Sequence, residues 1–163
     1  MAKVLCIDYQ KCTGCRTCEQ VCVVKHEGVL NPIRSRIRIM KWEAEGLYVP
    51  MLCSQCQDAP CVNVCPVRAI HRDDKLGRVW IDYDICIGCR SCITVCPFGA
   101  MSFNPISRQV FKCDLCDGDP QCVRFCDVGA LTYIDAEEIS TDKKWRAAQR
   151  VHMAGGNSAS LIA

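Results

Sequence analysis

The chain has 163 residues, enough for one ordinary domain or two small ones. Its formal charge of +2 is close to neutral, which gives no indication of a nucleic-acid partner. Its 17 cysteines indicate either a disulfide scaffold or a metal protein. The odd count, and an N-terminus without the features of a secretory signal, disfavour disulfides and predict free thiols in a reducing cytoplasm. No apolar run reaches the length of about 18 residues that predicts a membrane-spanning helix.

The first half of the chain alternates short apolar segments with two groups of four cysteines. Residues 4–9 predict a strand that leads into the first group. Residues 36–42 and 47–51 predict a hairpin closed across residues 43–46. A short strand at residues 69–70 follows the second group. The two groups are Cys12, Cys15, Cys18 and Cys22, then Cys53, Cys56, Cys61 and Cys65.

The second half of the chain repeats this arrangement. Residues 79–83 predict a strand before the third group, and residues 100–103 predict one after it. Residues 130–134 predict a further strand after the fourth group. The two groups are Cys86, Cys89, Cys92 and Cys96, then Cys113, Cys116, Cys122 and Cys126. The repetition predicts copies of one small structural unit.

The cysteine spacing points to iron–sulfur clusters. Groups one and three have the C-x2-C-x2-C-x3-C spacing of bacterial ferredoxins, and groups two and four widen the middle gap. A loop with two intervening residues turns successive sulfurs and backbone N–H groups to one side, and Gly14 and Gly88 permit positive φ there. The fourth cysteine is expected on the first turns of a helix, where it can bind a second cluster. Zinc sites are the alternative, but they rarely place three cysteines within seven residues.

These features predict an α+β protein of two bacterial-ferredoxin-like units, each holding two [4Fe–4S] clusters. Each unit is only about 70 residues long, so the clusters are expected to stabilise it, and the cluster-free chain is expected to be largely unfolded. Four thiolates around a doubly positive cube leave a charge of roughly −2 per cluster, so the loaded chain carries about −6. The spacing alone leaves open whether the four groups pair in a nested or a sequential order.

The motifs around the last three groups resemble those of a known family. Residues 53–66 read CSQCQDAPCVNVCP, residues 86–100 read CIGCRSCITVCPFGA, and residues 112–116 read KCDLC. They resemble the four-cluster electron-transfer beta subunits of dimethyl sulfoxide reductase and formate dehydrogenase, and the small subunits of tungsten aldehyde oxidoreductases. The resemblance covers about residues 1–135 of this chain.

The resemblance implies a nested pairing of the groups, one with four and two with three, and a set of four ligands for each cluster. The first set is Cys12, Cys15, Cys18 and Cys126. The second set is Cys22, Cys113, Cys116 and Cys122. The third set is Cys53, Cys56, Cys61 and Cys96. The fourth set is Cys65, Cys86, Cys89 and Cys92.

The nested pairing also implies a division of the chain. Residues 1–32 with residues 105–139 form a first two-cluster unit, and residues 52–104 form a second. Residues 33–51 form a hairpin connection between them. Residues 140–163 form a C-terminal helix and tail.

The resemblance implies an electron-transfer subunit with no catalytic residues of its own. The expected partner is a large molybdenum- or tungsten-pterin catalytic subunit, with an aldehyde oxidoreductase as the leading choice, and the expected acceptor is a flavoprotein, NAD-linked or other subunit. No Gly-rich nucleotide fingerprint is present in the chain itself. A subunit of formate dehydrogenase or hydrogenase and a free soluble polyferredoxin are alternatives, and a zinc-bound interaction module is a distant one. An anaerobic cytoplasm is the expected setting, without membrane insertion.

Three features lie outside the cysteine groups. Cys6, on the first strand, is expected to be a buried thiol. His26 is expected to be a surface histidine, with proton coupling to a cluster as the alternative. A last helix is expected over residues 142–153, capped by Ser140 or Thr141 and ended by the glycine pair that follows.

Charged residues are distributed unevenly. A basic set, expected on one face of a strand as a solvated face or a docking patch, consists of Arg34, Arg36 and Arg38. An acidic set follows much later and consists of Asp114, Asp117, Asp119, Asp127, Asp135, Glu137 and Glu138. Separate basic and acidic faces suit oriented docking and would permit head-to-tail self-association.

Overall fold

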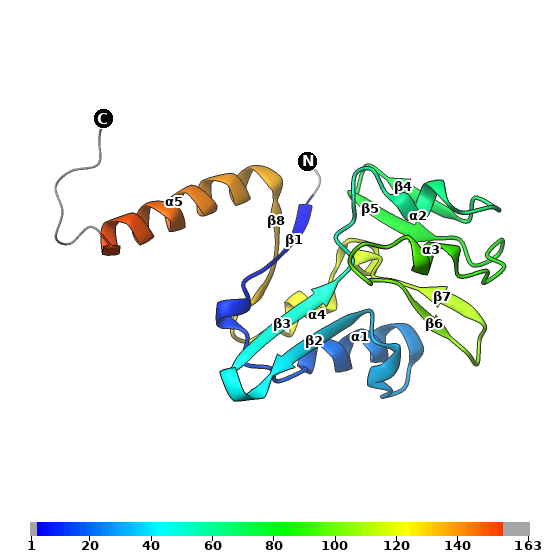
Figure 1. The fold of residues 1–163 in the computed structure, drawn as a ribbon, viewed down its shortest axis with the longest axis horizontal. Helices are drawn as coiled ribbons and strands as arrows, with labels where there is room; N and C mark the ends of the chain where they lie inside the picture. Colours follow the sequence, from blue (N-terminus) through cyan, green and yellow to red (C-terminus); the bar gives the residue numbers. More distant parts are fainter. Residues whose placement is uncertain (1–2, 155–163) are drawn as a thin grey trace.

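The computed structural model describes residues 3–154 as short elements in two halves, with one longer helix extending from them (Figure 1). The first elements are β1 (Lys3–Ile7), η1 (Tyr9–Lys11), α1 (Thr17–Glu27), η2 (Pro32–Arg34), β2 (Ile37–Trp42), η3 (Glu43–Glu45), β3 (Leu47–Leu52), α2 (Pro60–Asn63) and β4 (Ile70–Asp73). The remaining elements are β5 (Arg78–Ile81), α3 (Ser91–Thr94), β6 (Ser102–Asn104), β7 (Gln109–Phe111), η4 (Leu115–Gly118), α4 (Gln121–Arg124), β8 (Leu131–Asp135) and α5 (Ala136–Ala154). The predicted α+β class is confirmed.

The strands pair as four antiparallel two-stranded sheets: β1–β8, β2–β3, β4–β5 and β6–β7. Three of them join neighbouring strands, but β1 and β8 come from opposite ends of the described chain, with Lys3 opposite Asp135 and Ile7 opposite Leu131. This pairing places the first and last strands side by side, while β4 to β7 form the other half (Figure 1).

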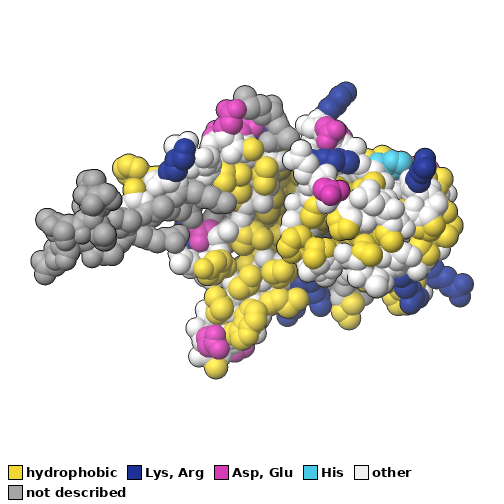
Figure 2. Space-filling view, turned by 45° about the horizontal axis from the view of Figure 1, so that its top comes forward, with side chains coloured by type: hydrophobic (Ala, Val, Ile, Leu, Met, Phe, Trp, Pro, Cys, Tyr) yellow, Lys and Arg dark blue, Asp and Glu magenta, His cyan; other side chains and the backbone are white. Residues whose placement is uncertain are grey.

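The predicted hairpin is present as β2 and β3. Ile37 and Ile39 alternate inward along β2 and are buried, as expected for a strand with one face on a core. Its other face begins with Arg38 and continues with the apolar Met40 and Trp42, which are each 47% exposed. Hydrophobic side chains are gathered on the visible surface of the molecule (Figure 2).

Two hydrophobic cores organise the fold. The first contains the inner residues of the β2–β3 hairpin together with cysteines of groups one and four: Cys18, Cys22, Ile37, Ile39, Leu52, Cys113, Leu115, Cys122 and Leu131. The second contains residues of β4, β5 and β7 with a cysteine of group three: Ala59, Ile70, Val79, Ile81, Cys92, Met101 and Val110. Cysteines of the second group pack mainly against this second core, but Cys53 packs against the first. Thiols therefore take core positions that aliphatic side chains fill in most proteins of this size.

The helices differ from the sequence expectation in two ways. Helices α2, α3 and α4 have four residues each, so the last cysteine of their groups lies just beyond the helix end and not on its first turns. Helix α5 begins at Ala136, six residues before the predicted start, because Glu137 and Glu138 suit a helix N-terminus and Ser140 and Thr141 lie within the helix. The glycine pair expected to end it lies outside the described residues.

Within residues 3–154, the structure contains no helix that is both long and apolar enough to cross a lipid bilayer.

Candidate iron–sulfur sites

One cavity is lined by Cys12, Cys15, Cys18 and Cys126. Cys12 ends η1, Cys15 lies in the loop that follows, Cys18 is on α1, and Cys126 comes directly after α4. The β1–β8 pairing and the contact of α1 with α4 bring these distant segments together. The remaining lining is mainly apolar, with Thr13, Arg16 and Thr17 as its polar members. The site is open at Cys15, which is exposed.

A second cavity is lined by Cys53, Cys56, Cys61 and Cys96. The first three belong to the loop after β3 and to α2, and Cys96 follows α3. Helices α2 and α3 contact each other, which brings Cys96 back to the second group. The remaining lining is apolar except for Ser54 and Lys112.

A third set of thiols lies in the first core. Cys22, Cys113 and Cys122 are buried and Cys116 is half-buried. Burial raises the pKa of Cys122, and the thiols of Cys113, Cys22 and Cys116, followed by Cys18 of the first set, raise it further. Cys22, Cys113 and Cys122 share one buried core.

The thiols of the fourth predicted set lie partly at the second core: Cys65, Cys86 and Cys92 belong to it or pack against it. Cys89 is exposed. Cys92 is buried on α3, and burial raises its pKa to about 11, with additional contributions from Cys89, Cys61 and Cys86. Cys65 packs against the same core after α2. Its Sγ accepts a hydrogen bond from the Ala69 N–H at 3.2 Å.

The thiols are arranged to hold a cation. Burial raises the pKa of Cys18 and of Cys113, each to about 12, because a buried thiolate loses its hydration. A metal ion reverses this preference, since thiolate is the form that binds metal. At the more exposed Cys15 and Cys89, hydrogen bonds from Thr17 and Ser91 lower the pKa instead.

Backbone N–H groups already point at several sulfurs. Arg36 donates to Cys22 Sγ at 3.4 Å, Ala100 donates to Cys96 Sγ at 3.4 Å, and Leu115 donates to Cys113 Sγ at 3.5 Å. Donors of this kind stabilise the negative charge on cluster sulfurs and tune the reduction potential.

The loops of groups one and three need glycine for two reasons. Gly14 and Gly88 have φ of +69° and +66°. A Cβ on Gly14 would lie 2.6 Å from Cδ1 of Tyr48, and a Cβ on Gly88 would overlap the carbonyl oxygen of Arg108. The backbone of each cysteine loop is therefore packed against another segment, which fixes the direction of its thiols.

The donor set fits iron–sulfur clusters. None of the 17 cysteines is in a disulfide, and two cavities are each lined by four thiols in an apolar setting with backbone N–H donors nearby. Soft thiolate ligands of this kind select iron–sulfur clusters or zinc. The largely apolar lining and the donors to sulfur also suit a cluster.

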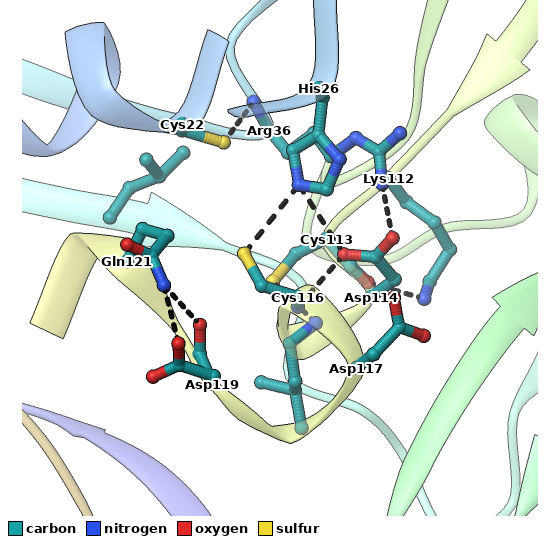
Figure 3. A network of polar contacts seen from close by, with 12 residues as sticks. Cys22, His26, Arg36, Lys112, Cys113, Asp114, Cys116, Asp117, Asp119 and Gln121 are labelled. Atoms are coloured by element: carbon teal, nitrogen blue, oxygen red, sulfur yellow. Dashed lines mark hydrogen bonds and ion pairs between the residues drawn. The ribbon is translucent and has the colours of Figure 1, made fainter. Parts of the chain in front are cut away.

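Two residues outside the cysteine groups, His26 and Cys6, differ from expectation. His26 is not at the surface: its Nε2 lies 3.6 Å from Cys116 Sγ and 3.5 Å from Asp114 Oδ1 (Figure 3), and burial lowers the pKa of its imidazole. Cys6 is half-buried and not fully buried, because β1 and β8 form a two-stranded sheet with little cover. Local sequence gives no signal for the packing of His26 against a segment 90 residues away.

The basic set does not form a solvated face, because all three arginines are half-buried and have partners within the chain. Arg36 donates to Asp114 Oδ2 at 2.5 Å, Arg34 pairs with Glu27, and Arg38 donates to the carbonyl oxygen of Pro32. Two acids of the later segment are thus used within the chain, since Arg78 pairs with Asp117 as Arg36 does with Asp114. The predicted charge asymmetry is thereby partly cancelled within the chain, and head-to-tail self-association stays a prediction.

Residues 44–136 match the family described as a 4Fe-4S dicluster domain, and residues 9–24 match a 4Fe-4S binding domain. The chain belongs to the 4Fe-4S dicluster domain family. It therefore binds several [4Fe–4S] clusters, and the predicted cofactor is confirmed.

Curated relatives carry names from redox metabolism. The polyferredoxin-like subunit of an aliphatic sulfonate oxidoreductase of Pyrococcus furiosus is 46% identical over 53% of this chain and 50% of its own length. The electron transport protein HydN of Escherichia coli is 40% identical over 67% of this chain and 65% of its own. The iron-sulfur subunit of an arsenate respiratory reductase of a Shewanella species is 43% identical over 60% of this chain and 43% of its own length. The chain thus spans two thirds or less of the length of each of these relatives.

Proposed function

We propose that this chain is an electron-transfer subunit that carries four [4Fe–4S] clusters between a catalytic subunit and an electron acceptor. The observation that carries the proposal is the gathering of thirteen of the sixteen group cysteines, from four separate segments, in or against two cores. Each bound cluster accepts and releases one electron. The residues of the chain bind, space and insulate the clusters, and it has no catalytic residues of its own.

We assign the ligands in nested order, as the resemblance implies. The assignment is supported by the two cavities, each lined by cysteines from one early and one late group. The remaining two sets are supported by packing. Cys22, Cys113 and Cys122 are buried together in the first core. Cys65, Cys86 and Cys92 lie in or against the second core. The two cores favour a division into two two-cluster units, with the β2–β3 hairpin packed on the first.

We infer that the four sites form a row. Cys18 and Cys22 lie on the same helix, so the first and second sites are neighbours. Cys113 of the second set is close enough to Cys53 of the third for the charges to interact. Cys61 of the third set influences Cys92 of the fourth in the same way. A row of sites suits electron passage from one end of the subunit to the other.

A groove of about 250 Å³ lies beside this row. It is lined by Trp42 and Met51 of the hairpin and by Phe98, which also lines the cavity of the third set. All three side chains are partly exposed. Arg36 and Arg38 also line the groove, which is otherwise largely apolar. An exposed groove of this kind next to a cluster site favours a protein partner docked there over a freely diffusing carrier.

The partner we propose is a large pterin-type catalytic subunit that holds molybdenum or tungsten, with a flavoprotein or other subunit as acceptor. The family resemblance and the relatives named as subunits of oxidoreductases support this. An aldehyde oxidoreductase is our leading choice among such partners. A free electron carrier is the second candidate, since HydN is named an electron transport protein and not a subunit.

The test is affinity purification of the tagged chain from its own host without air, followed by reduction of the product. We expect a large pterin-containing chain in stoichiometric amount, and uptake of about four electrons by this subunit. A brown protein that takes up four electrons but is always isolated alone would support the free carrier. A colourless product that takes up none would refute electron transfer.

A further inference from the structure

Lys112 is a buried cation between two of the cluster sites. It lies between β7 and Cys113, and only 2% of its surface is exposed. Its Nζ donates hydrogen bonds to the carbonyl oxygens of Val79 and Cys113, the latter at 2.7 Å, and to Oε1 of Gln55 at 3.4 Å. All three acceptors are neutral, so they satisfy its N–H groups and leave its charge uncompensated.

Other cations of this region have carboxylate partners. Arg36 lies 2.5 Å from Asp114, and Arg78 pairs with Asp117. Lys112 has none within 4.0 Å among the carboxylates of the described chain. An ammonium group that is buried without a counter-charge is strongly unfavourable, which requires a negative group beside it in the working protein.

The surroundings of Lys112 identify that negative group. Its side chain lines the cavity of Cys53, Cys56, Cys61 and Cys96, the third ligand set. It also interacts electrostatically with Cys113, a ligand of the second set, and it holds the carbonyl oxygen of that residue. Figure 3 shows Lys112 reaching into the network around Cys113. Lys112 thus faces two sites that each carry roughly −2 when loaded.

Gln55 fixes this placement. It lies in the loop of the second group, and its Nε2 donates to the carbonyl oxygen of Cys113 at 2.8 Å. Its Oε1 accepts from the Val79 N–H at 2.8 Å and from Lys112. The amide therefore ties the loop of group two to the first ligand of group four, with the ammonium group held at the same point.

We propose that Lys112 is the shared counter-ion of the second and third clusters and raises the reduction potential of both. The proposal rests on the proposed function. A fixed positive charge in a buried setting is little screened, and it stabilises the reduced, more negative state of each neighbouring cluster. It also reduces the repulsion between two anionic clusters placed on either side of it. Lys112 is a positioning residue at the junction of the two cores, where an electron must cross from one half to the other.

The test compares three variants of the loaded protein by redox titration followed by electron paramagnetic resonance. Lys112→Met removes the charge and keeps the length of the side chain, and Lys112→Arg keeps the charge. Arg72→Met is the matched control, because Arg72 donates to the carbonyl oxygens of Gln55 and Cys56 in the same loop but is partly exposed and paired with Asp74. We expect two of the four potentials to become more negative in Lys112→Met, to stay near wild type in Lys112→Arg, and to move less in Arg72→Met.

The outcomes separate this proposal from the proposed function. Four unchanged potentials in a fully loaded Lys112→Met protein would overturn the role of Lys112 and leave electron transfer intact. A wild-type protein without four reducible clusters would overturn the proposed function itself. If the Lys112→Met protein does not take up iron, the Lys112→Arg protein should still take it up and the neutral Lys112→Gln protein should not. Equal iron uptake by the Lys112→Gln and Lys112→Arg proteins would refute the need for charge.

Discussion

Gly88→Ala tests whether the packing of a cysteine loop against a distant backbone is needed to hold a cluster. Gly88 lies between Cys86 and Cys89 with φ +66°, and a Cβ there would lie closer than 3.0 Å to the carbonyl oxygen of Arg108. The left-handed conformation costs about 1–2 kcal/mol for a residue other than glycine. The overlap adds about 1–3 kcal/mol, because its partner is backbone and cannot rotate away.

Gly28→Ala is the matched control. Gly28 has φ +70°, close to that of Gly88, but nothing lies within 4 Å of the position of its Cβ. The control therefore carries the conformational cost without the overlap. The difference in stability between the two variants therefore measures the cost of the overlap alone, which we expect to be about 1–3 kcal/mol.

The assay is the rate at which visible absorption is lost in guanidinium chloride under anaerobic conditions, since loss of clusters is irreversible. If the overlap is relieved when the loop opens, Gly88→Ala should bleach roughly 5- to 160-fold faster than Gly28→Ala. A Gly88→Ala protein isolated with less iron than the control would agree with the same reasoning. Equal iron content and equal bleaching rates would refute it.

Four further outcomes are expected. Gly14→Ala should also speed bleaching, and Tyr48→Ala in the same chain should recover part of the loss, because the clash there is with a side chain. Glu19 is 1% exposed and accepts a hydrogen bond from the Ile39 N–H at 2.6 Å. Glu19→Ala should therefore lower the activation free energy of bleaching by about 1–3 kcal/mol, and Glu19→Gln should lower it less. Removal of iron by a chelator should abolish most of the far-ultraviolet circular dichroism, because the clusters stabilise both cores. Cys6→Ser should leave iron content unchanged, since Cys6 lies on β1 outside the four ligand sets.

The sequence predicts the cysteine chemistry well because cluster binding is encoded in local spacing. It also predicts the β2–β3 hairpin, since alternating apolar residues such as Ile37 and Ile39 mark a strand directly. Strand β7 was not predicted, as three residues are too few to give a clear period. The start of α5 was misplaced because Ser140 and Thr141 imitate an N-cap, while Ala136 continues directly from β8.

Contacts between distant segments account for the remaining differences. His26, Arg36 and Asp114 meet only because α1, the start of β2 and the loop after β7 converge, and no local pattern records this. In the sequence, Lys112 directly precedes Cys113 and is part of the KCDLC motif. Its position after Val110 and Phe111, both buried, is the signal that could have indicated a buried charge.

The most direct measurement is the content of iron, acid-labile sulfide and zinc in the protein prepared without air. We expect about sixteen iron and sixteen sulfide per chain, with no stoichiometric zinc. About eight of each would remove half of the proposed ligand sets, and zinc in place of iron and sulfide would contradict the account as a whole.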